Sequence, residues 1–247
     1  MTSVPTKGDD APLDTRLIWA GLFLCVALFA KLPRIDLAVA AHYYTPGLGF
    51  IHAQDPVVRA LYLWSPTVGR AIVATLAVFA LISPLIARLL RGLGHATLAQ
   101  RCTGPWRRLA IVAVLCGLLG PGLVVEGWFK NAMGRPRPVQ VIELGGTEPF
   151  HGTFQPGADT AHHRSFVSSH AAAGFWLMSL GLTAGPVWRR RWLLIGVVTG
   201  SVIGAGRMMQ GGHFLSDIIF AFYAVWVSCE IIAFCDRRWQ QRHAHAQ

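Results

Sequence analysis

Long apolar runs, separated by charged or proline-rich stretches, dominate the hydropathy pattern of the chain. Six of these runs are candidates for helices that cross a membrane, and they cover residues 17–32, 67–90, 109–129, 166–184, 192–206 and 214–234. A helix needs about 20 mainly apolar residues to cross a bilayer, and most of the runs come close to that length. The pattern therefore predicts an all-α, polytopic membrane protein with six transmembrane helices.

The polar segments between the runs define the expected domain organisation. Residues 1–15 contain Asp, Pro and Gly and predict a flexible N-terminal tail, and residues 239–247 predict a basic C-terminal tail. The six-helix membrane domain is expected to cover residues 16–238. Residues 34–66 mix charges, prolines and aromatic side chains, which favours short interfacial helices. Residues 130–165 form the longest polar connection and are expected to be an extracytoplasmic loop.

Glycine and proline punctuate two of the predicted helices. Gly120-Pro121-Gly122 interrupts the third run, where we expect a kink. Gly196, Gly200 and Gly204 recur every four residues in the fifth run. That spacing places the glycines on one helix face and allows another helix to approach closely. It is a packing signal and not a nucleotide-binding loop.

Composition supports the membrane prediction and excludes other classes. The chain is 53% hydrophobic and only 14% charged, whereas soluble domains carry about 25% charged residues. The net charge of +10 does not indicate nucleic-acid binding, because the basic residues lie mainly at the ends of apolar runs. The five cysteines have no metal-ligand spacing and imply no disulfide framework.

Arginine distribution predicts the topology. Residues 88–108 carry five arginines and no acidic residue, and residues 189–191 are all arginine. Six spans place these connections on the same side as both termini, and the positive-inside rule makes that side cytoplasmic. The connections 34–66, 130–165 and 207–213 are then expected to face away from the cytoplasm.

Alternation of helix direction brings several chemically active side chains to this outer end. The end of the third run, the start of the fourth, the end of the fifth and the start of the sixth lie at one depth. The cations, hydroxyl, histidines and carboxylate that converge there are Lys130, Arg137, Ser168, His170, Arg207, His213 and Asp217. Cations and helix N-terminal amides bind phosphoryl oxygens, and histidines can carry out phosphoryl transfer.

The stretch around His213 has the most informative spacing. His213 and Asp217 are four residues apart, so a helix would place them on one face. A carboxylate that fixes one imidazole nitrogen leaves the other free as a nucleophile or base. Gly211 and Gly212 permit a sharp turn before the helix, and Arg207 can offer a fork to phosphate.

Three stretches resemble the signature motifs of the type 2 phosphatidic acid phosphatase superfamily. Lys130, six residues and then Arg137-Pro138 match its first motif fully. The second motif, Pro-Ser-Gly-His, corresponds to Val167-Ser168-Ser169-His170. The third motif is Ser-Arg, five residues, His, three residues, Asp. It corresponds to Gly206-Arg207, then His213, then Asp217. The chemically active residues are all kept, and the departures are Val167, Ser169 and Gly206.

The resemblance implies a mechanism without metal or cofactor. His213 would attack phosphorus and form a phosphohistidine, Asp217 would orient it, and His170 would protonate the leaving alcohol and later activate water. The residues implied as phosphate ligands are Lys130, Arg137, Ser168, Ser169 and Arg207. His213 must attack as a neutral imidazole while His170 starts as an acid, so their environments must differ.

Other polar residues near the motifs have simpler interpretations. Glu126 lies one helical turn before Lys130 and is expected to pair with it or to line a lipid cleft. Arg135 falls outside the motif and is expected to be a solvated charge. The loop histidines, expected on a lid near the substrate headgroup and not around a metal, are His151, His162 and His163.

The expected function is hydrolysis of a membrane lipid phosphate in a bacterial inner membrane, with the site facing the periplasm. Candidate substrates are a lipid A phosphate, undecaprenyl pyrophosphate, phosphatidylglycerophosphate and phosphatidic acid. The sequence of residues 209–217 is similar to that of bacterial lipid A phosphatases, which favours a lipid A phosphate as the substrate. The expected partners are the bilayer and this lipid, with no nucleic acid.

Two alternatives remain open at the level of sequence. A lipid phosphotransferase on the same fold would pass the phosphoryl group to another lipid instead of water. A transporter or non-catalytic binding protein would use the cations to hold an anionic headgroup, although binding alone does not need the His170, His213 and Asp217 set. The related soluble haloperoxidases are disfavoured by the apolar runs.

Overall fold

The computed structural model describes residues 14–244, and this part of the chain is helical. Its α-helices are α1 (Arg16–Lys31), α2 (Ile35–Ala41), α3 (Pro56–Gly92), α4 (Ala96–Thr103), α5 (Pro105–Gly117), α6 (Lys130–Ala132), α7 (Ser169–Phe175), α8 (Pro186–Met209) and α9 (Leu215–Ala244). Its other helical segments are η1 (Ile51–Gln54), the π-helix η2 (Leu118–Phe129), η3 (Pro138–Gln140), η4 (Ile142–Leu144) and η5 (Trp176–Gly181). Isolated bridges are the only β-pairing in the described part of the chain, so the all-α prediction is confirmed.

Four helical stretches are long and apolar enough to cross a membrane. They are α3, the continuous stretch Ala96–Ala132, α8 and α9. The expected first span, α1, has 16 residues, and the expected fourth span is divided between α7, with 7 residues, and η5. The chain is therefore a multi-pass membrane protein, while the count of six full spans is not confirmed.

The chain ends and the first connection differ in detail from the expected boundaries. Residues 1–13 of the expected N-terminal tail lie outside the described residues. At the other end, α9 continues to Ala244 and takes in most of the expected basic tail. Short helices do follow α1, but residues 56–66 form the start of α3. Pro56 at the first helical turn favours this early start.

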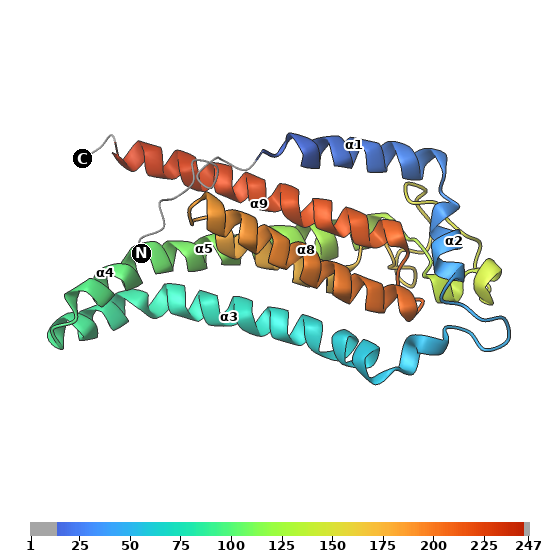
Figure 1. The fold of residues 1–247 in the computed structure, drawn as a ribbon, viewed down its shortest axis with the longest axis horizontal. Coiled ribbons are helices and arrows are strands. Elements are labelled where there is room, and N and C mark those ends of the chain that lie inside the picture. Colours follow the sequence, from blue (N-terminus) through green and yellow to red (C-terminus); the bar gives the residue numbers. More distant parts are fainter. Residues whose placement is uncertain (1–13, 245–247) are drawn as a thin grey trace, which may run out of the picture.

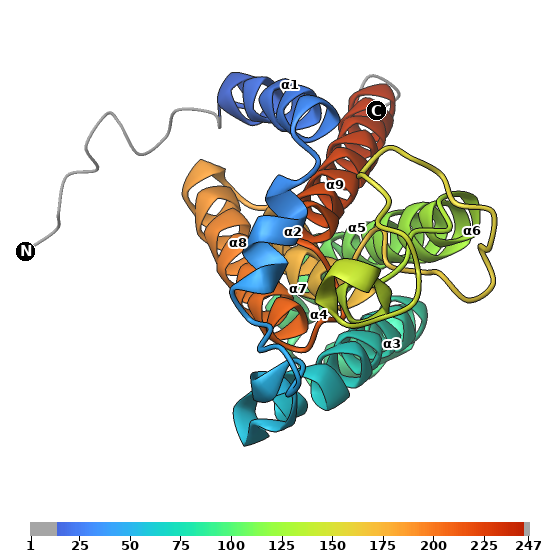
Figure 2. The same ribbon diagram turned by 90° about the vertical axis from the view of Figure 1, so that its right-hand side faces the viewer.

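The helices alternate in direction along a common axis (Figure 1). In that view α1, α5 with η2, and α8 run towards the end that carries α2. The returning helices are α3, α7 with η5, and α9. Figure 2, seen from the α2 end, places α7 inside a ring made by α3, α5, α8 and α9. This central position explains why α7 is largely buried although it is short.

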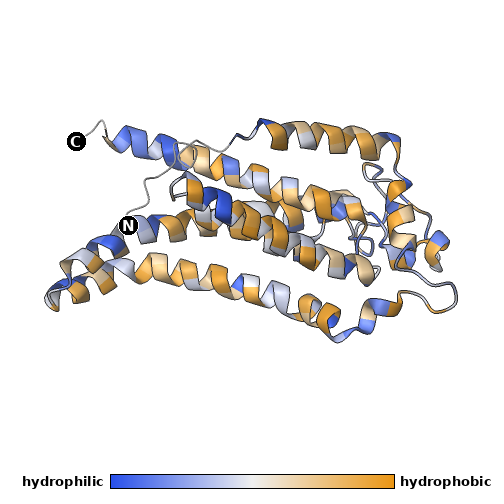
Figure 3. Ribbon diagram, viewed as in Figure 1, coloured by the Kyte–Doolittle hydropathy of each residue, from blue (hydrophilic) through white to orange (hydrophobic). Residues whose placement is uncertain are grey.

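Hydrophobic residues predominate along the middle of the helices, and hydrophilic residues gather towards the ends of the bundle (Figure 3). On α3, for example, Leu81 is 78% exposed and Leu85 is 60% exposed. Such a large exposed apolar surface is incompatible with water and suits lipid chains. The interior is filled by aromatic contacts, including Phe29 against Phe220 and Phe166 against Phe220.

Glycines allow the close approach that places α7 and α8. A Cβ at Gly200 would overlap the Phe175 ring, and one at Gly196 would lie 2.8 Å from the Met178 backbone nitrogen. A Cβ at Gly204 would overlap Ile218 of α9. The four-residue glycine repeat therefore acts in helix packing, as the sequence predicted. The Gly120-Pro121-Gly122 interruption takes the form of the π-helix η2.

Candidate active site

A cavity of about 710 Å³ opens at the α2 end of the bundle, between α3, η2, α7 and α8. Six of the eight residues predicted for the site line it, and these are Lys130, Arg137, Ser169, His170, Arg207 and His213. Asp217 and Ser168 are fully buried and lie behind its wall. The structure thus brings together predicted side chains from three stretches, 130–137, 168–170 and 207–217, that are far apart in sequence.

His213 lies in the turn between α8 and α9 and is only 2% exposed. Gly211, at φ +63°, makes the turn in a backbone region that favours glycine. The His213 Nδ1 atom lies 3.4 Å from Asp217 Oδ2, a contact that is longer than a regular hydrogen bond. The Asp217 carboxylate faces Nδ1, which leaves Nε2 as the nitrogen available for chemistry in the cavity.

Burial lowers the pKa of His213 to about 3, although the nearby Asp217 carboxylate acts in the opposite direction. The charges of Lys130 and Arg207 also lower this pKa. The imidazole of His213 is therefore neutral over the physiological range. A neutral imidazole has the lone pair that a nucleophile needs.

His170 lies at the start of α7 and lines the same cavity as His213. Its ring stacks on Tyr62 of α3, with ring centroids 5.1 Å apart and planes inclined by 21°. The guanidinium of Arg207 lies over the same tyrosine, 4.5 Å from its centroid. Tyr62 therefore contacts both His170 and Arg207 and helps to fix their positions relative to each other. Sequence reasoning missed it, because an aromatic residue near a helix end is usually an interfacial anchor.

The cavity contains several polar atoms that are ready to contact an anion. Arg137 Nε, Arg207 Nε and Ser169 Oγ are buried and have no hydrogen-bond partner. Lys130 is 6% exposed, and its Nζ donates a bond of 2.9 Å to the carbonyl oxygen of Arg164. Buried donors without partners are costly, and phosphoryl oxygens would satisfy them.

Gly212 makes room for one of these cations. A Cβ on Gly212 would overlap the guanidinium of Arg207, whose Nη1 also donates to Gln210 Oε1. The glycine pair therefore has two separate tasks. Gly211 permits the turn, and Gly212 permits the arginine to lie against the backbone beside His213.

Ser168 occupies a different place from the one expected of a phosphate ligand. Its Oγ accepts a bond of 3.4 Å from the backbone N–H of Ala171 and so caps α7. Its own N–H donates to the carbonyl oxygen of Asp217 at 3.1 Å. The next residue, Ser169, faces the cavity instead. Ser168 thus fixes the start of α7 relative to α9.

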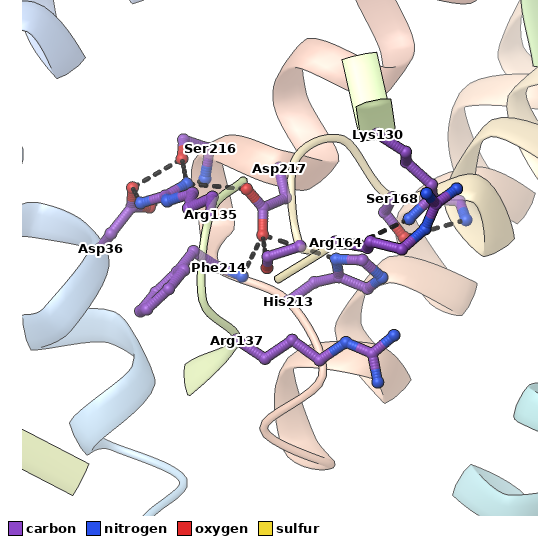
Figure 4. A network of polar contacts seen from close by, with 12 residues as sticks. Asp36, Lys130, Arg135, Arg137, Arg164, Ser168, His213, Phe214, Ser216 and Asp217 are labelled. Carbon is purple, nitrogen blue, oxygen red and sulfur yellow. Dashed lines mark hydrogen bonds and ion pairs between the residues drawn. The ribbon is translucent and has the colours of Figure 1, made fainter. Parts of the chain in front are cut away.

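The expectation that Arg135 is a solvated charge is wrong. Arg135 is 0% exposed, and its guanidinium lies between Asp36 of α2 and Asp217 of α9 (Figure 4). Two carboxylates compensate the burial of this cation, and Gly134, at φ +51°, turns the backbone just before it. Spacing within the chain could not reveal this, because Asp36 lies 99 residues away.

Two further cations line the cavity without having been predicted. Arg164 lies 3.6 Å from the Glu126 carboxylate and donates to Asn131 Oδ1 at 2.8 Å. Glu126 also lines the cavity, which matches one of its two expected positions. Arg70 lines the cavity from within α3, where a charged residue in an apolar helix is unusual.

The loop histidines lie outside the cavity wall. His162 is 79% exposed and contacts Asp159, while the His163 ring lies 3.8 Å from Glu148. The carbonyl oxygen of His151 accepts a bond from Arg135 Nε. Among residues 14–244, no group of three or more His, Cys, Asp or Glu is placed to hold a metal ion.

Away from the cations, the cavity is apolar. Its walls there come from α3, the junction of α5 and η2, and α7 with η5, with side chains from Val73, Ala74, Leu118, Pro121, Ala173 and Trp176. Trp176 is fixed by a bond of 2.8 Å from its Nε1 to the carbonyl oxygen of Ala113. The cavity therefore suits an amphiphile whose anionic part lies at the histidines.

Comparison with known proteins agrees with this geometry. The model of the PAP2 superfamily matches residues 109–241, and the chain belongs to this superfamily. It is a membrane phosphatase similar to proteins named lipid A 4'-phosphatase. One, from Francisella tularensis subsp. novicida, is 29% identical over 217 residues, which cover 86% of this chain and 92% of that protein.

Two further relatives with the same name come from Rhizobium etli and Rhizobium leguminosarum. They are 34% and 30% identical to the chain, over 116 and 115 residues. Each match covers 47% of this chain, with 43% of the first protein and 48% of the second. No solved structure gives a significant match.

Proposed function

We propose that the protein hydrolyses a phosphate ester of a membrane lipid through a phosphohistidine on His213, with a lipid A phosphate as the favoured substrate. One observation carries the proposal. The cavity joins two histidines and unpartnered cationic donors at one end to an apolar cleft at the other. A lipid phosphate has the same division into an anionic and an apolar part.

In the first step, His213 Nε2 attacks phosphorus, and the bond from phosphorus to the lipid oxygen breaks. His170 gives its proton to that oxygen, so that the lipid leaves as an alcohol. Arg137, Arg207 and Lys130 hold the phosphoryl oxygens and stabilise the charge that they carry in the transition state. Asp217 stabilises the positive charge that develops on the His213 ring.

In the second step, water attacks the phosphohistidine and His170 accepts its proton. The bond from phosphorus to His213 Nε2 breaks, and inorganic phosphate leaves. His213 returns to its neutral form, which the low pKa of this buried ring favours. The proton taken from water returns His170 to its acid form. Burial and the charge of Arg207 lower the pKa of this ring to about 4, and the negative charge of a bound phosphoryl group acts in the opposite direction.

The relatives support the substrate that we favour. The first of them aligns over most of both chains and is named lipid A 4'-phosphatase. Lipid A is an amphiphile, and its phosphate would meet the cations while its acyl chains lie beside α3 and η2. We also propose that the cavity opens to the periplasm and that both termini lie in the cytoplasm, because arginines are dense at the opposite end of the bundle.

The proposal is tested by phosphate release from purified lipid phosphates in detergent. The panel contains lipid A, undecaprenyl pyrophosphate, phosphatidylglycerophosphate and phosphatidic acid. We expect the highest kcat/KM with lipid A, inhibition by vanadate, and loss of at least about 10³-fold in kcat for His213→Ala. His162→Ala, at an exposed site outside the cavity, is the matched control and should keep wild-type activity.

The outcomes separate the alternatives. Turnover retained in His213→Ala would exclude the phosphohistidine. A labelled phosphoryl group found on a second lipid, with no inorganic phosphate released, would show a phosphotransferase. Lipid binding by the wild type without any bond cleavage would instead favour a transporter or a binding protein.

A further inference from the structure

Arg135 is a fully buried cation that the proposed chemistry does not use. It is absent from the cavity wall, so it cannot contact phosphate there. Its Nη2 donates to Asp36 Oδ2 at 2.8 Å, and its Nη1 donates to Asp217 Oδ1 at 2.7 Å. The attraction within a buried ion pair offsets the free energy of desolvation only where the geometry is good and the remaining polar atoms form hydrogen bonds.

The guanidinium of Arg135 is fixed by further contacts. Its Nε donates to the carbonyl oxygen of His151 at 3.0 Å, and its Nη1 also donates to Ser216 Oγ at 2.8 Å. The group lies over the ring of Phe214, 4.4 Å from the ring centroid. Phe214 directly follows His213. Arg135 therefore touches both the neighbour of the nucleophile and the carboxylate that faces it.

Asp36 completes this network from α2. Its Oδ1 accepts the backbone N–H of Ser216 at 2.9 Å, and its Oδ2 accepts Ser216 Oγ at 2.6 Å and Thr153 Oγ1 at 3.2 Å. Ser216 directly precedes Asp217 at the start of α9. One carboxylate of α2 thus holds the arginine bound to Asp217 and the backbone next to Asp217.

The two oxygens of Asp217 have separate roles as a result. Oδ1 accepts from Arg135, whereas Oδ2 accepts from Ser165 Oγ at 2.6 Å and from the N–H of Phe214 at 2.8 Å. Oδ2 is also the oxygen that lies 3.4 Å from His213 Nδ1. Rotation of the carboxylate would break these bonds together, so its orientation towards His213 is fixed.

We infer that Arg135 and Asp36 are positioning residues that hold Asp217 as a carboxylate facing His213 and thereby set the rate of phosphoryl transfer. The inference rests on the proposed function of His213. Neither residue contacts the substrate. Figure 4 shows the order of the groups, with Arg135 between Asp36 and Asp217, and His213 on the other side of Asp217.

The test uses Asp36→Asn in the full-length protein in detergent. This change keeps the shape of the side chain but removes the charge that balances Arg135. We expect kcat to fall about 10- to 100-fold, by analogy with the loss seen when groups that orient metal-binding side chains are removed. KM and the inhibition constant of inorganic phosphate should stay within about twofold, because the cations of the cavity are untouched.

Two further variants sharpen the result. Arg135→Lys should lower kcat at least as far, because one ammonium group cannot reproduce a planar fork that contacts two carboxylates. Asp236→Asn is the matched control. It removes the carboxylate that Arg108 contacts at 2.5 Å near the far end of α9, and its kcat should remain that of the wild type.

A double variant of Asp36 and Asp217 distinguishes a positioning role of Asp36 from a purely structural one. Asp36→Asn should cause no further loss of kcat in an Asp217→Asn background, because both act through the same carboxylate. If Asp36→Asn does not fold, Ser216→Ala replaces it, since it removes one donor and one acceptor without a change of charge. Its kcat should then fall several-fold at an unchanged KM.

Three results would overturn the inference. The first is a wild-type kcat in the folded Asp36→Asn or Ser216→Ala variant. The second is a weakening of phosphate inhibition as large as the loss of kcat. The third is a loss of kcat in the double variant of Asp36→Asn and Asp217→Asn that equals the product of the two single losses. Failure of the proposed function is distinguishable from these results. In that case, the wild-type protein itself would release no phosphate from any lipid in the panel.

Discussion

At the scale of single residues, the site depends on contrasts between neighbours in the sequence. Ser168 caps α7 while Ser169 faces the cavity, and Arg135 is buried in the scaffold while Arg137 lines the cavity. Within each pair the side-chain chemistry is nearly the same. Whether each of these side chains lines the cavity therefore depends on where the backbone directs it and not on its residue type.

The burial of His213 has a consequence for stability that can be measured. Its pKa is about 3 in the folded protein and about 6.5 in an unfolded chain. Between these values the unfolded state binds a proton that the folded state does not. Stability from this group is therefore present above pH 6.5 and is lost as the pH falls towards 3, by at most about 1.4 kcal/mol per pH unit.

We therefore expect the thermal midpoint of the wild type in detergent to fall between pH 7 and pH 5 by more than that of His213→Asn. The carboxylates and other histidines titrate in both proteins, so the difference between the two isolates His213. Parallel curves for the wild type and the variant would show that burial does not keep this ring neutral.

At the scale of elements, the chain packs α7 in the centre by using glycine wherever another helix must come close. Gly200 of α8 lies against Phe175 and Gly174 of α7. His170 is on the same short helix, so this packing also sets the position of the second histidine. The glycine repeat thus contributes to the site through the placement of a helix.

Gly200→Ala should destabilise the protein, because its new methyl group would overlap the Phe175 ring. Overpacking of this kind costs about 1–3 kcal/mol, and we expect a lower thermal midpoint together with a lower kcat. Gly92→Ala is the control, since no atom lies within 4 Å of a Cβ built there. An unchanged midpoint for Gly200→Ala would mean that α7 and α8 are less closely packed than described.

The sequence predicted the elements better than it predicted the contacts between them. Apolar runs and the glycine repeat indicated helices and their packing, and motif spacing indicated six of the residues that line the cavity. Tyr62 and the pairing of Asp36 with Arg135 were missed, because such contacts join segments without a shared pattern. The short α7 was overestimated as a span, since an apolar run does not distinguish a buried helix from one that faces lipid.

At the scale of the whole molecule, the arrangement of charge predicts an orientation in the membrane. The α2 end carries the cavity, while the arginine-dense connections lie at the opposite end (Figure 1). The hydrophobic residues of the helices lie mainly between the two ends (Figure 3). We therefore expect the cavity and the strongly basic end to face opposite sides of a bilayer.

This orientation is tested with a cysteine at each end. His162→Cys should react with a membrane-impermeant maleimide in cells whose outer membrane has been made permeable. Arg242→Cys should react only after the inner membrane is opened. The wild-type protein, with its five cysteines, gives the background. The reverse pattern of labelling would place the cavity on the cytoplasmic side.

The contacts around Arg135 indicate which residues a fragment of this protein needs in order to be active. The superfamily match starts at residue 109, yet Asp36 and Tyr62 lie before it and contact the groups of the site. A fragment trimmed to residues 109–241 would contain all three motifs and would lack the partners that orient Asp217 and His170. If the proposed positioning roles hold, we therefore expect the smallest active unit of this chain to be longer than the region that the superfamily shares.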